Sequence, residues 1–313
     1  MTLTELRYLV NLDKERHFGH AAERSFVSQP TLSVAIKKLE EQLGVTLFER
    51  VRGEVKPTPI GERVVQQAKR VLSEAKLLED LALEGQDELK GPLRFGAIYT
   101  VAPYLLPHLI PILRKLAPKM PLVIEENFTA KLMEQMRDNE LDVACVAIPI
   151  EQQGLAAWPL FDEDFVVVLP ADHPWAQDAQ IPARRLAEES LLLLGPGHCF
   201  RDQVIEACPK CIDPDASGPQ PHTGSSLETI RHMVAGGLGL TVLPRSSVEN
   251  RPVEESPLLV ARPFAGKAPS RRIALVWRKT FPRFKAIEVL HKAIVDGPLQ
   301  GVSFLPDAPV AET

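Results

Sequence analysis

The chain has 313 residues, of which 45% are hydrophobic and 25% charged, and a formal net charge of −5. These values are ordinary for a globular protein of two or three domains. Because no run reaches the roughly 18 apolar residues of a spanning helix, and no signal-peptide core is found, we expect a cytoplasmic protein without membrane contact. The acidic excess falls on residues 87–313, whereas residues 1–86 have 13 basic and 13 acidic side chains. A phosphate-facing surface is therefore expected only on the N-terminal part.

Three helices are predicted within the first 44 residues. Thr2 followed by Glu5 is typical of a capping box that opens the first helix, and a short second helix covers residues 19–24. Ser28 caps the third helix, with Pro30 in its first turn. Apolar residues at spacings of 4, 3 and 4 predict one buried stripe along the third helix, formed by Leu32, Ile36, Leu39 and Leu43.

The opposite face of the third helix has polar side chains that can bond to base edges and phosphates, namely Gln29, Thr31, Ser33 and Lys37. Two short helices, a tight turn and a polar-faced third helix are typical of a helix-turn-helix. Residues 47–57, with Gly53 at a turn, predict a two-stranded wing whose basic side chains contact the DNA backbone: Arg50, Arg52 and Lys56. The spacing also fits a small helical bundle whose charges are only solvated.

Several motifs run through the first 62 residues: Ala21-Ala22, Ser28-Gln29-Pro30-Thr31-Leu32-Ser33, Ile36, Leu39-Glu40, Leu43-Gly44, Leu47-Phe48-Glu49-Arg50 and Thr58-Pro59-Ile60-Gly61-Glu62. Together they resemble the LysR-type transcriptional regulators. The resemblance implies a winged helix-turn-helix DNA-binding domain over residues 1–58 and adds Pro30 to the DNA contacts. Val34 departs from the polar or basic residue of many members, which bears on base preference and not on the fold.

Residues 59–86 are predicted to form one long helix. Its apolar residues alternate at spacings of 4 and 3 over about three heptads, as in a coiled-coil seam: Val64, Ala68, Val71, Ala75, Leu78 and Ala82. Because no partner helix adjoins it in the sequence, we expect this seam to pack against a second subunit rather than against its own domain. In the family that the chain resembles, this linker helix makes the dimer.

From Pro92 onward, predicted strands and helices alternate in a βαβ pattern. The first strands are expected at residues 93–98, 122–128 and 143–148, with helices at residues 103–116 and 131–139. A second sheet includes residues 166–169 and 191–194, followed by a helix opened by Ser225 or Ser226 and a strand at residues 240–243; residues 272–277 return to the first sheet. We therefore predict an α/β regulatory domain with two lobes, similar to periplasmic binding proteins.

The expected boundaries are residues 87–163 and 268–300 for lobe I, residues 164–267 for lobe II, and residues 301–313 for a C-terminal tail. Ligands of such sheets bind at the carboxyl ends of strands, in the crevice between the lobes.

Three of the four cysteines lie within thirteen positions, at Cys199, Cys208 and Cys211. Cys199 precedes a predicted helix and has His198 and Arg201 beside it. A helix N-terminus and cationic neighbours favour the thiolate, which is the form that attacks peroxides. In a helix, the Cα atoms of Cys199 and Cys208 would lie roughly 13 Å apart, whereas a disulfide needs about 4.4–6.8 Å. Closing that bond would therefore require the helix to unwind.

Spacing alone leaves three alternatives for these cysteines. Buried, inert thiols come first, then a redox pair, and then a zinc site in which Cys208 and Cys211 join His198 or Cys199. The fourth cysteine, Cys145, lies in an apolar strand and is expected to be inert core.

Further motifs are Gly197-His198-Cys199, Arg201-Asp202-Gln203, Cys208, Ser226-Leu227-Glu228-Thr229 and Met233-Val234-Ala235. They resemble the hydrogen-peroxide-sensing branch of the LysR family, so that the resemblance covers nearly the whole chain. It implies a peroxidatic Cys199 and a resolving Cys208, with a peroxide site made by Thr100, Thr129, His198, Arg201 and Asp202. Thr100 and Thr129 fit equally well as caps of the helices that follow them.

The chain departs from that branch at Pro209, at Cys211 and in the proline-rich residues up to Pro221. These departures affect whether Cys208 or Cys211 forms the disulfide with oxidised Cys199. We expect Cys208 to do so and Cys211 to be a bystander or a slow substitute.

Three functions follow in order of preference. The first is a regulator that senses hydrogen peroxide through a Cys199–Cys208 disulfide, which rearranges the oligomer on DNA. The second is a LysR-type regulator with a small organic effector between its lobes, and the third is a thiol peroxidase, for which a DNA-binding head has no use. The resemblance implies no cofactor and no metal. It implies double-stranded DNA, hydrogen peroxide, RNA polymerase and a homotetramer made of two dimers as partners, in activation of an oxidative stress response.

Overall fold

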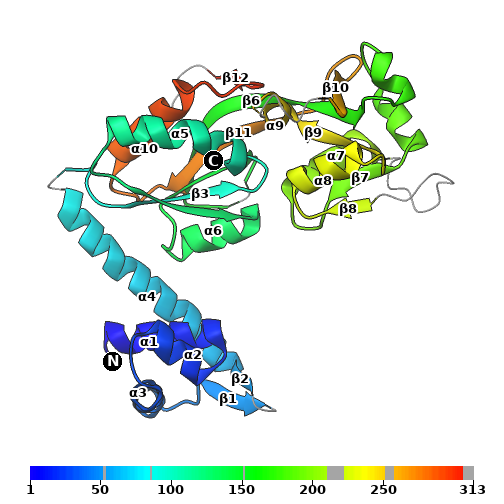
Figure 1. Ribbon diagram of the computed structural model, residues 1–313. Coiled ribbons are helices and arrows are strands. Elements are labelled where there is room, and N and C mark those ends of the chain that lie inside the picture. Colours follow the sequence, from blue (N-terminus) through cyan, green and yellow to red (C-terminus); the bar gives the residue numbers. More distant parts are fainter. Residues whose placement is uncertain (52–53, 85–86, 151, 210–221, 251–256, 306–313) are drawn as a thin grey trace. The chain divides into compact units, whose positions relative to one another are not determined.

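The computed structural model describes residues 1–51, 54–84, 87–150, 152–209, 222–250 and 257–305 (Figure 1). The chain divides into two compact units, Met1–Gln86 and Asp87–Thr313. Within the described ranges, no helix is long and apolar enough to cross a membrane.

The first unit consists of α1 (Leu3–Glu15), α2 (Phe18–Arg24), α3 (Gln29–Leu43), β1 (Phe48–Val51), β2 (Glu54–Pro57) and α4 (Pro59–Glu84). Thr2 and Glu5 form the predicted capping box, and the Ser28 hydroxyl accepts a hydrogen bond from the backbone N–H of Thr31. Strands β1 and β2 pair antiparallel as the predicted wing, although the turn expected at Gly53 lies outside the described residues. This order of elements is that of a winged helix-turn-helix.

The stripe predicted on α3 is buried over three of its four residues. Leu32, Ile36 and Leu39 are at most 2% exposed and pack with α1 and α2 in one hydrophobic core. Leu43 is 38% exposed instead. It is the last residue of α3, where Gly44 in the left-handed region ends the helix, so it extends past the helices that cover the stripe.

The apolar residues of α4 are covered differently from the prediction. Val65 and Ala68 are 1% and 3% exposed and belong to the core of their own unit, where α4 contacts α1. The beginning of the predicted seam is therefore covered within the chain, contrary to the expectation that no helix adjoins it. Farther along, Val71 is 36% and Leu78 69% exposed. The side chain of Ala82 is outside the described part.

The first lobe of the second unit contains β3 (Leu93–Ile98), α5 (Ala102–Leu116), β4 (Leu122–Asn127), α6 (Thr129–Arg137), β5 (Val143–Ile148), β11 (Ser270–Arg278) and α10 (Phe284–Val295). Strand β3 pairs in parallel with β4 and β5, and β11 returns to pair antiparallel with β5, as predicted.

The second lobe contains β7 (Leu191–Leu194), α7 (Cys199–Ala207), β8 (His222–Gly224), α8 (Leu227–Ala235), β9 (Leu240–Pro244), α9 (Arg245–Glu249), β10 (Leu259–Pro263) and the short 3-10 helices Pro174–Gln177 and Ala183–Glu188. Strand β7 pairs in parallel with β8 and β9. The two-lobed α/β architecture is the predicted one.

One strand, β6 (Leu155–Pro170), belongs to both lobes (Figure 1). Its first part pairs with β11 and β12 (Ser303–Phe304), and its last part pairs with β9 and β10. The sequence predicted only residues 166–169 of it, because Pro159 and the acidic residues 162–164 interrupt the apolar pattern. Residues 303–304, expected in a C-terminal tail, form part of this sheet.

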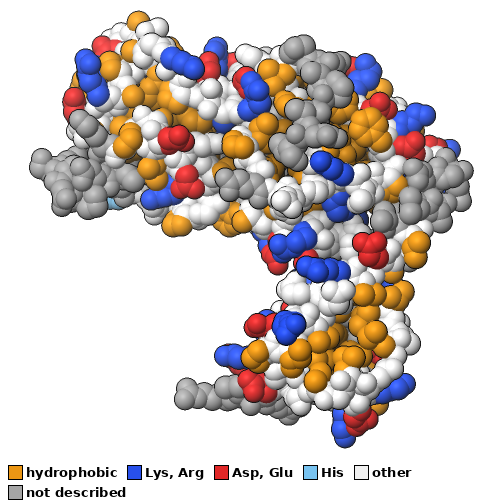
Figure 2. All heavy atoms as spheres, turned by 180° about the vertical axis from the view of Figure 1, so that it is seen from behind, with side chains coloured by type: hydrophobic (Ala, Val, Ile, Leu, Met, Phe, Trp, Pro, Cys, Tyr) orange, Lys and Arg blue, Asp and Glu red, His pale blue; other side chains and the backbone are white. Residues whose placement is uncertain are grey.

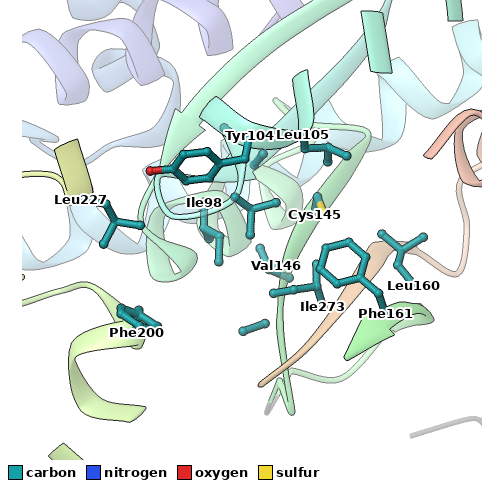
Figure 3. Close-up of a cluster of buried hydrophobic side chains, with 14 of the residues drawn as sticks. Ile98, Tyr104, Leu105, Cys145, Val146, Leu160, Phe161, Phe200, Leu227 and Ile273 are labelled. Carbon is teal, nitrogen blue, oxygen red and sulfur yellow. The ribbon is translucent and has the colours of Figure 1, made fainter. Parts of the chain in front are cut away.

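A continuous core fills the second unit, and Figure 3 shows part of it. Cys145 lies in this cluster with 0% exposure, and burial raises the pKa of its thiol to about 12. It is therefore the inert core residue that was predicted. On the outside, Figure 2 shows basic and acidic side chains interspersed over one face, with hydrophobic side chains between them.

Candidate functional site

Four of the predicted site residues line one small pocket in the second unit: Thr100, Thr129, His198 and Cys199. The rest of its lining is Ile98, Tyr99, Asn127, Phe128 and Gly197. The cavity between these side chains has a volume of about 10 Å³. It has room for roughly one molecule of the size of water.

The pocket lies where the carboxyl ends of three strands meet. Thr100 follows β3, Thr129 follows β4 and opens α6, and Cys199 follows β7 as the first residue of α7. Because β3 and β4 are parallel, their carboxyl ends lie at one edge of the sheet, where ligands of α/β folds bind. The sequence placed both threonines correctly after their strands.

Cys199 is a partly buried, free cysteine. The Thr129 hydroxyl donates a hydrogen bond to its sulfur over 3.6 Å. Cys199 is the first residue of α7, so it lies at the positive end of the helix dipole.

His198 is the N-cap residue of α7 and is 8% exposed. Burial lowers the pKa of its imidazole, and a hydrogen bond with the backbone of Ser225 opposes that shift in part. The ring is therefore neutral near pH 7. His198 does not supply the positive charge that the sequence led us to expect beside Cys199.

Arg201 and Asp202 do not line the pocket. The Arg201 guanidinium donates a 2.8 Å hydrogen bond to the carbonyl oxygen of Leu194, and Asp202 is exposed.

A buried ion pair that the sequence analysis did not predict contacts Thr100. The side chains of Arg271 and Glu163 are 0% exposed, and Arg271 Nε donates to Glu163 Oε2 over 2.8 Å. Arg271 also donates to Thr100 Oγ1 (2.7 Å) and to the Thr100 carbonyl (3.1 Å), while the other Glu163 oxygen accepts from the Ser246 N–H (3.0 Å). In the sequence these residues stand in charged runs that are typical of a surface, so no pattern distinguished them.

A second contact joins the two lobes beside this region. The hydroxyl of Tyr104, on α5, donates a short hydrogen bond to a carboxylate oxygen of Glu228, on α8. Burial, together with Glu228, raises the pKa of Tyr104. The pKa of Glu126 is also raised, first by burial and then by the charge of Glu228.

Cys208 is the C-cap residue of α7, at the opposite end from Cys199. It is 4% exposed, and its sulfur lies 3.5 Å from the carbonyl oxygen of Ala183. Cys208 is disulfide-bonded in this structure, but not to Cys199, which is free. The helix separates the two Cα atoms by roughly 13 Å. Cys211 and the proline-rich residues up to Pro221 lie outside the described residues, within which no group of His, Cys, Asp and Glu is arranged to hold a metal.

The predicted base-contacting residues lie at the beginning of α3. Gln29, Pro30, Thr31 and Lys37 are exposed and Ser33 is half-buried, with Val34, at 67% exposure, between them. Lys37 forms an ion pair with Glu41 (3.9 Å), and Lys56 of the wing pairs with Glu54 (3.3 Å). The Arg50 side chain and all of Arg52 lie outside the described part of the chain.

Both units match models of the same protein family. Residues 3–62 match the bacterial regulatory helix-turn-helix protein, lysR family, and residues 86–297 match the LysR substrate binding domain. The DNA-binding transcriptional dual regulator OxyR of Escherichia coli K12 is 41% identical over 294 residues, which are 94% of this chain and 95% of the relative.

Solved structures agree with this match. A full-length OxyR variant from Pseudomonas aeruginosa is 50% identical, with a TM-score of 0.78 and 99% of both chains covered. A hydrogen-peroxide-bound OxyR mutant from Corynebacterium glutamicum is 37% identical, with a TM-score of 0.62 over 94% of this chain and 92% of the other. The chain belongs to the LysR family of DNA-binding transcriptional regulators, which are not enzymes. Within that family it falls in the OxyR branch.

Proposed function

We propose that this protein is a cytoplasmic transcription regulator that senses hydrogen peroxide by oxidation of Cys199. The observation that supports the proposal most directly is a partly buried, free Cys199 at the N-terminus of α7, in a pocket of about 10 Å³ with the Thr129 hydroxyl 3.6 Å from its sulfur. A pocket of this size accepts a peroxide far better than the organic effector considered as an alternative. Names of relatives, such as the hydrogen peroxide-inducible genes activator of Haemophilus influenzae, agree with this.

In the proposed reaction, the Cys199 thiolate attacks one oxygen of hydrogen peroxide. The S–O bond forms as the O–O bond breaks, and the leaving hydroxide takes up a proton to become water. Sulfur loses two electrons, the peroxide gains them, and a sulfenic acid results. We propose that the Thr129 hydroxyl orients the peroxide, which its hydrogen bond to the Cys199 sulfur supports, and that Thr100, whose hydroxyl accepts a hydrogen bond from Arg271, assists it.

Cys208 reacts as a thiol, so its existing disulfide must first be reduced by a dithiol, which is itself oxidised to a disulfide. The Cys208 thiol then attacks the sulfenic sulfur, the S–O bond breaks, and a second water leaves as the Cys199–Cys208 disulfide forms. The helical separation of roughly 13 Å must shrink to at most about 6.8 Å for that bond. Oxidation therefore requires α7 to unwind, and Cys208 to leave a site in which it is 4% exposed. We propose that this refolding of lobe II, residues 164–267, changes how the subunits are arranged on DNA.

The regulator is proposed to work as a dimer through residues 59–86, paired into a tetramer, and to act on RNA polymerase at its promoters. Its DNA contacts are proposed at Gln29, Pro30, Thr31, Ser33 and Lys37 for bases and Arg50, Arg52 and Lys56 for phosphates. Exposure of the beginning of α3 supports the first set.

Thiol titration tests the sensor. The protein is first reduced with dithiothreitol so that Cys208 enters as a thiol, the reductant is removed by desalting, and one equivalent of hydrogen peroxide is then added. We expect the loss of two thiols and, by peptide mapping, a Cys199–Cys208 disulfide. Cys199→Ser abolishes this loss, whereas Cys145→Ala, a change in the core, preserves it. If no thiol is lost in the unmutated protein, it is not a thiol-based sensor.

A further inference from the structure

Three aromatic rings from the two lobes form one wall of the Cys199 pocket. Tyr99 and Phe128 come from lobe I, and their ring centroids are 5.3 Å apart in an edge-to-face arrangement. The His198 ring lies 4.8 Å from Phe128 and 5.8 Å from Tyr99. Each ring thus contacts the other two, and all three line the cavity that contains the Cys199 sulfur.

The wall has little space behind it on the side of Gly197. This glycine has a φ of +95°, and a Cβ added there would lie 3.3 Å from Cε1 of Phe128. The Phe128 ring is therefore packed against backbone and cannot move farther toward Gly197. Tyr99 is 37% exposed and does not belong to the buried core.

We propose that Tyr99 and Phe128 form a size filter that makes Cys199 selective for hydrogen peroxide over alkyl hydroperoxides. This inference rests on the proposed peroxide reaction and names the residues that determine its substrate. The cavity of about 10 Å³ holds roughly one water-sized molecule. Hydrogen peroxide has one more oxygen atom than water, so the cavity has to widen only a little to admit it, whereas tert-butyl hydroperoxide has four carbons in addition to its two oxygens.

The direction in which the Cys199 thiolate attacks determines where the alkyl group of a larger peroxide has to lie. With an alkyl hydroperoxide, the thiolate attacks the terminal oxygen, the O–O bond breaks, and the alkoxide leaves and is protonated to the alcohol. The alkyl group therefore has to occupy pocket space away from the sulfur. Tyr99 and Phe128 have the largest side chains in the lining of this pocket, so their substitution by smaller residues enlarges it.

The experiment compares rates of Cys199 oxidation by hydrogen peroxide, tert-butyl hydroperoxide and cumene hydroperoxide. The full-length protein carries Cys208→Ser together with Cys211→Ser, so that neither thiol can consume the sulfenic acid and it accumulates. Dimedone labelling followed by mass spectrometry measures it. In this background we compare Tyr99→Ala, Phe128→Ala and the milder Phe128→Leu. Ile205→Ala is the matched control, because Ile205 is a partly buried residue of α7 that does not line the pocket.

We expect hydrogen peroxide to be favoured strongly in the Cys208→Ser, Cys211→Ser protein. Tyr99→Ala and Phe128→Ala should each raise the rate with tert-butyl hydroperoxide relative to hydrogen peroxide by about tenfold or more, the range for steric discrimination in a pocket. Phe128→Leu should give a smaller increase, Tyr99→Phe should retain the selectivity, and Ile205→Ala should not change it.

The two hypotheses fail in different ways. If hydrogen peroxide does not label Cys199 even in the Cys208→Ser, Cys211→Ser protein, the proposed sensor fails and the filter with it. If hydrogen peroxide labels Cys199 but the ratio of rates is the same in folded Tyr99→Ala, Phe128→Ala and Phe128→Leu proteins, the sensor stands and the filter is wrong. Circular dichroism establishes that the variants are folded.

Discussion

The hydroxyl of Thr129 is a test of how much a single hydrogen bond contributes at the Cys199 sulfur. Thr129→Val keeps the shape of the side chain and removes the donor. A hydrogen bond to a charged group contributes about 1.5–3 kcal/mol, so we expect Cys199 oxidation to slow by roughly tenfold to a hundredfold. Stopped-flow kinetics with hydrogen peroxide measure this, and Thr129→Ser should retain most of the rate. Equal rates for Val and Thr would show that this hydroxyl has no part in the reaction.

His198 makes stability depend on pH in a defined direction. Because burial holds its pKa below the ordinary value of 6.5, the unfolded chain binds the proton more readily than the folded one. The free energy of unfolding is therefore highest above pH 6.5 and decreases as the pH falls from 6.5 toward the folded pKa. Urea titrations between pH 7.5 and 5 should show this decrease.

His198→Asn should flatten that slope, while His222→Asn, at an exposed position on β8, should leave it intact. A slope that is identical in all three proteins would assign the pH dependence to other groups.

Arg271 and Arg272 are neighbours in the sequence with opposite environments. Arg271 is fully buried against Glu163, whereas Arg272 is 48% exposed and pairs with Asp162, itself 37% exposed. Arg271→Met leaves a buried carboxylate without its counter-ion, and we expect a loss of about 3–5 kcal/mol in the free energy of unfolding. Arg272→Met should cost less than about 1 kcal/mol. Urea denaturation of both variants measures the difference, and similar losses would contradict the assigned burial.

At the scale of elements, α4 combines two functions in one helix. Its beginning completes the core of the DNA-binding unit through Val65 and Ala68, and its later residues Val71 and Leu78 are left exposed. We expect the double variant Val71→Asp, Leu78→Asp to be folded but unable to form the normal oligomer, with weak operator binding. Analytical ultracentrifugation measures its mass, and Gln66→Asp, on another face of the helix, is the control. A normal oligomer in the double variant would place the dimer contact elsewhere.

The elements that the sequence predicted well are those with strong local signals. Thr2 and Ser28 cap their helices as expected, and the short apolar runs at Leu93–Ile98, Val143–Ile148 and Leu191–Leu194 are strands over those same residues. Periodicity cannot show what covers a helix, so the expectation that a second subunit covers the whole seam was wrong at its beginning, where Ala68 belongs to the core of its own unit and α4 contacts α1.

Local patterns gave less information about the pocket. The grouping of Thr100, Thr129 and Cys199 came from the resemblance and not from a local pattern, and Arg271 reaches Thr100 across 171 positions of sequence. Glu163 looked like a solvated residue because its neighbours Asp162 and Asp164 are acidic. A buried charge can be recognised only once the partner that neutralises it is known, and that knowledge requires the fold.

For the molecule as a whole, the consequence of β6 concerns cooperativity. Its sixteen residues take part in the hydrogen-bond ladders of both lobes, and Glu163 lies at the point where the strand passes from one to the other. If one lobe melts, part of β6 loses its hydrogen-bond partners, although the same strand is paired in the sheet of the other lobe. The regulatory unit should therefore unfold in one transition despite its two lobes.

Tryptophan fluorescence can follow each lobe separately, because Trp158 and Trp277 lie in strands β6 and β11 of the first lobe and Trp175 in the second. One Trp→Phe variant keeps only Trp158 and Trp277, and another keeps only Trp175. The melting temperatures measured with these two variants should coincide, and the calorimetric and van't Hoff enthalpies of this unit should agree. Two separate midpoints would mean that the lobes melt independently. In that case one part of β6 would unfold with its lobe while the other part stayed paired in the second lobe.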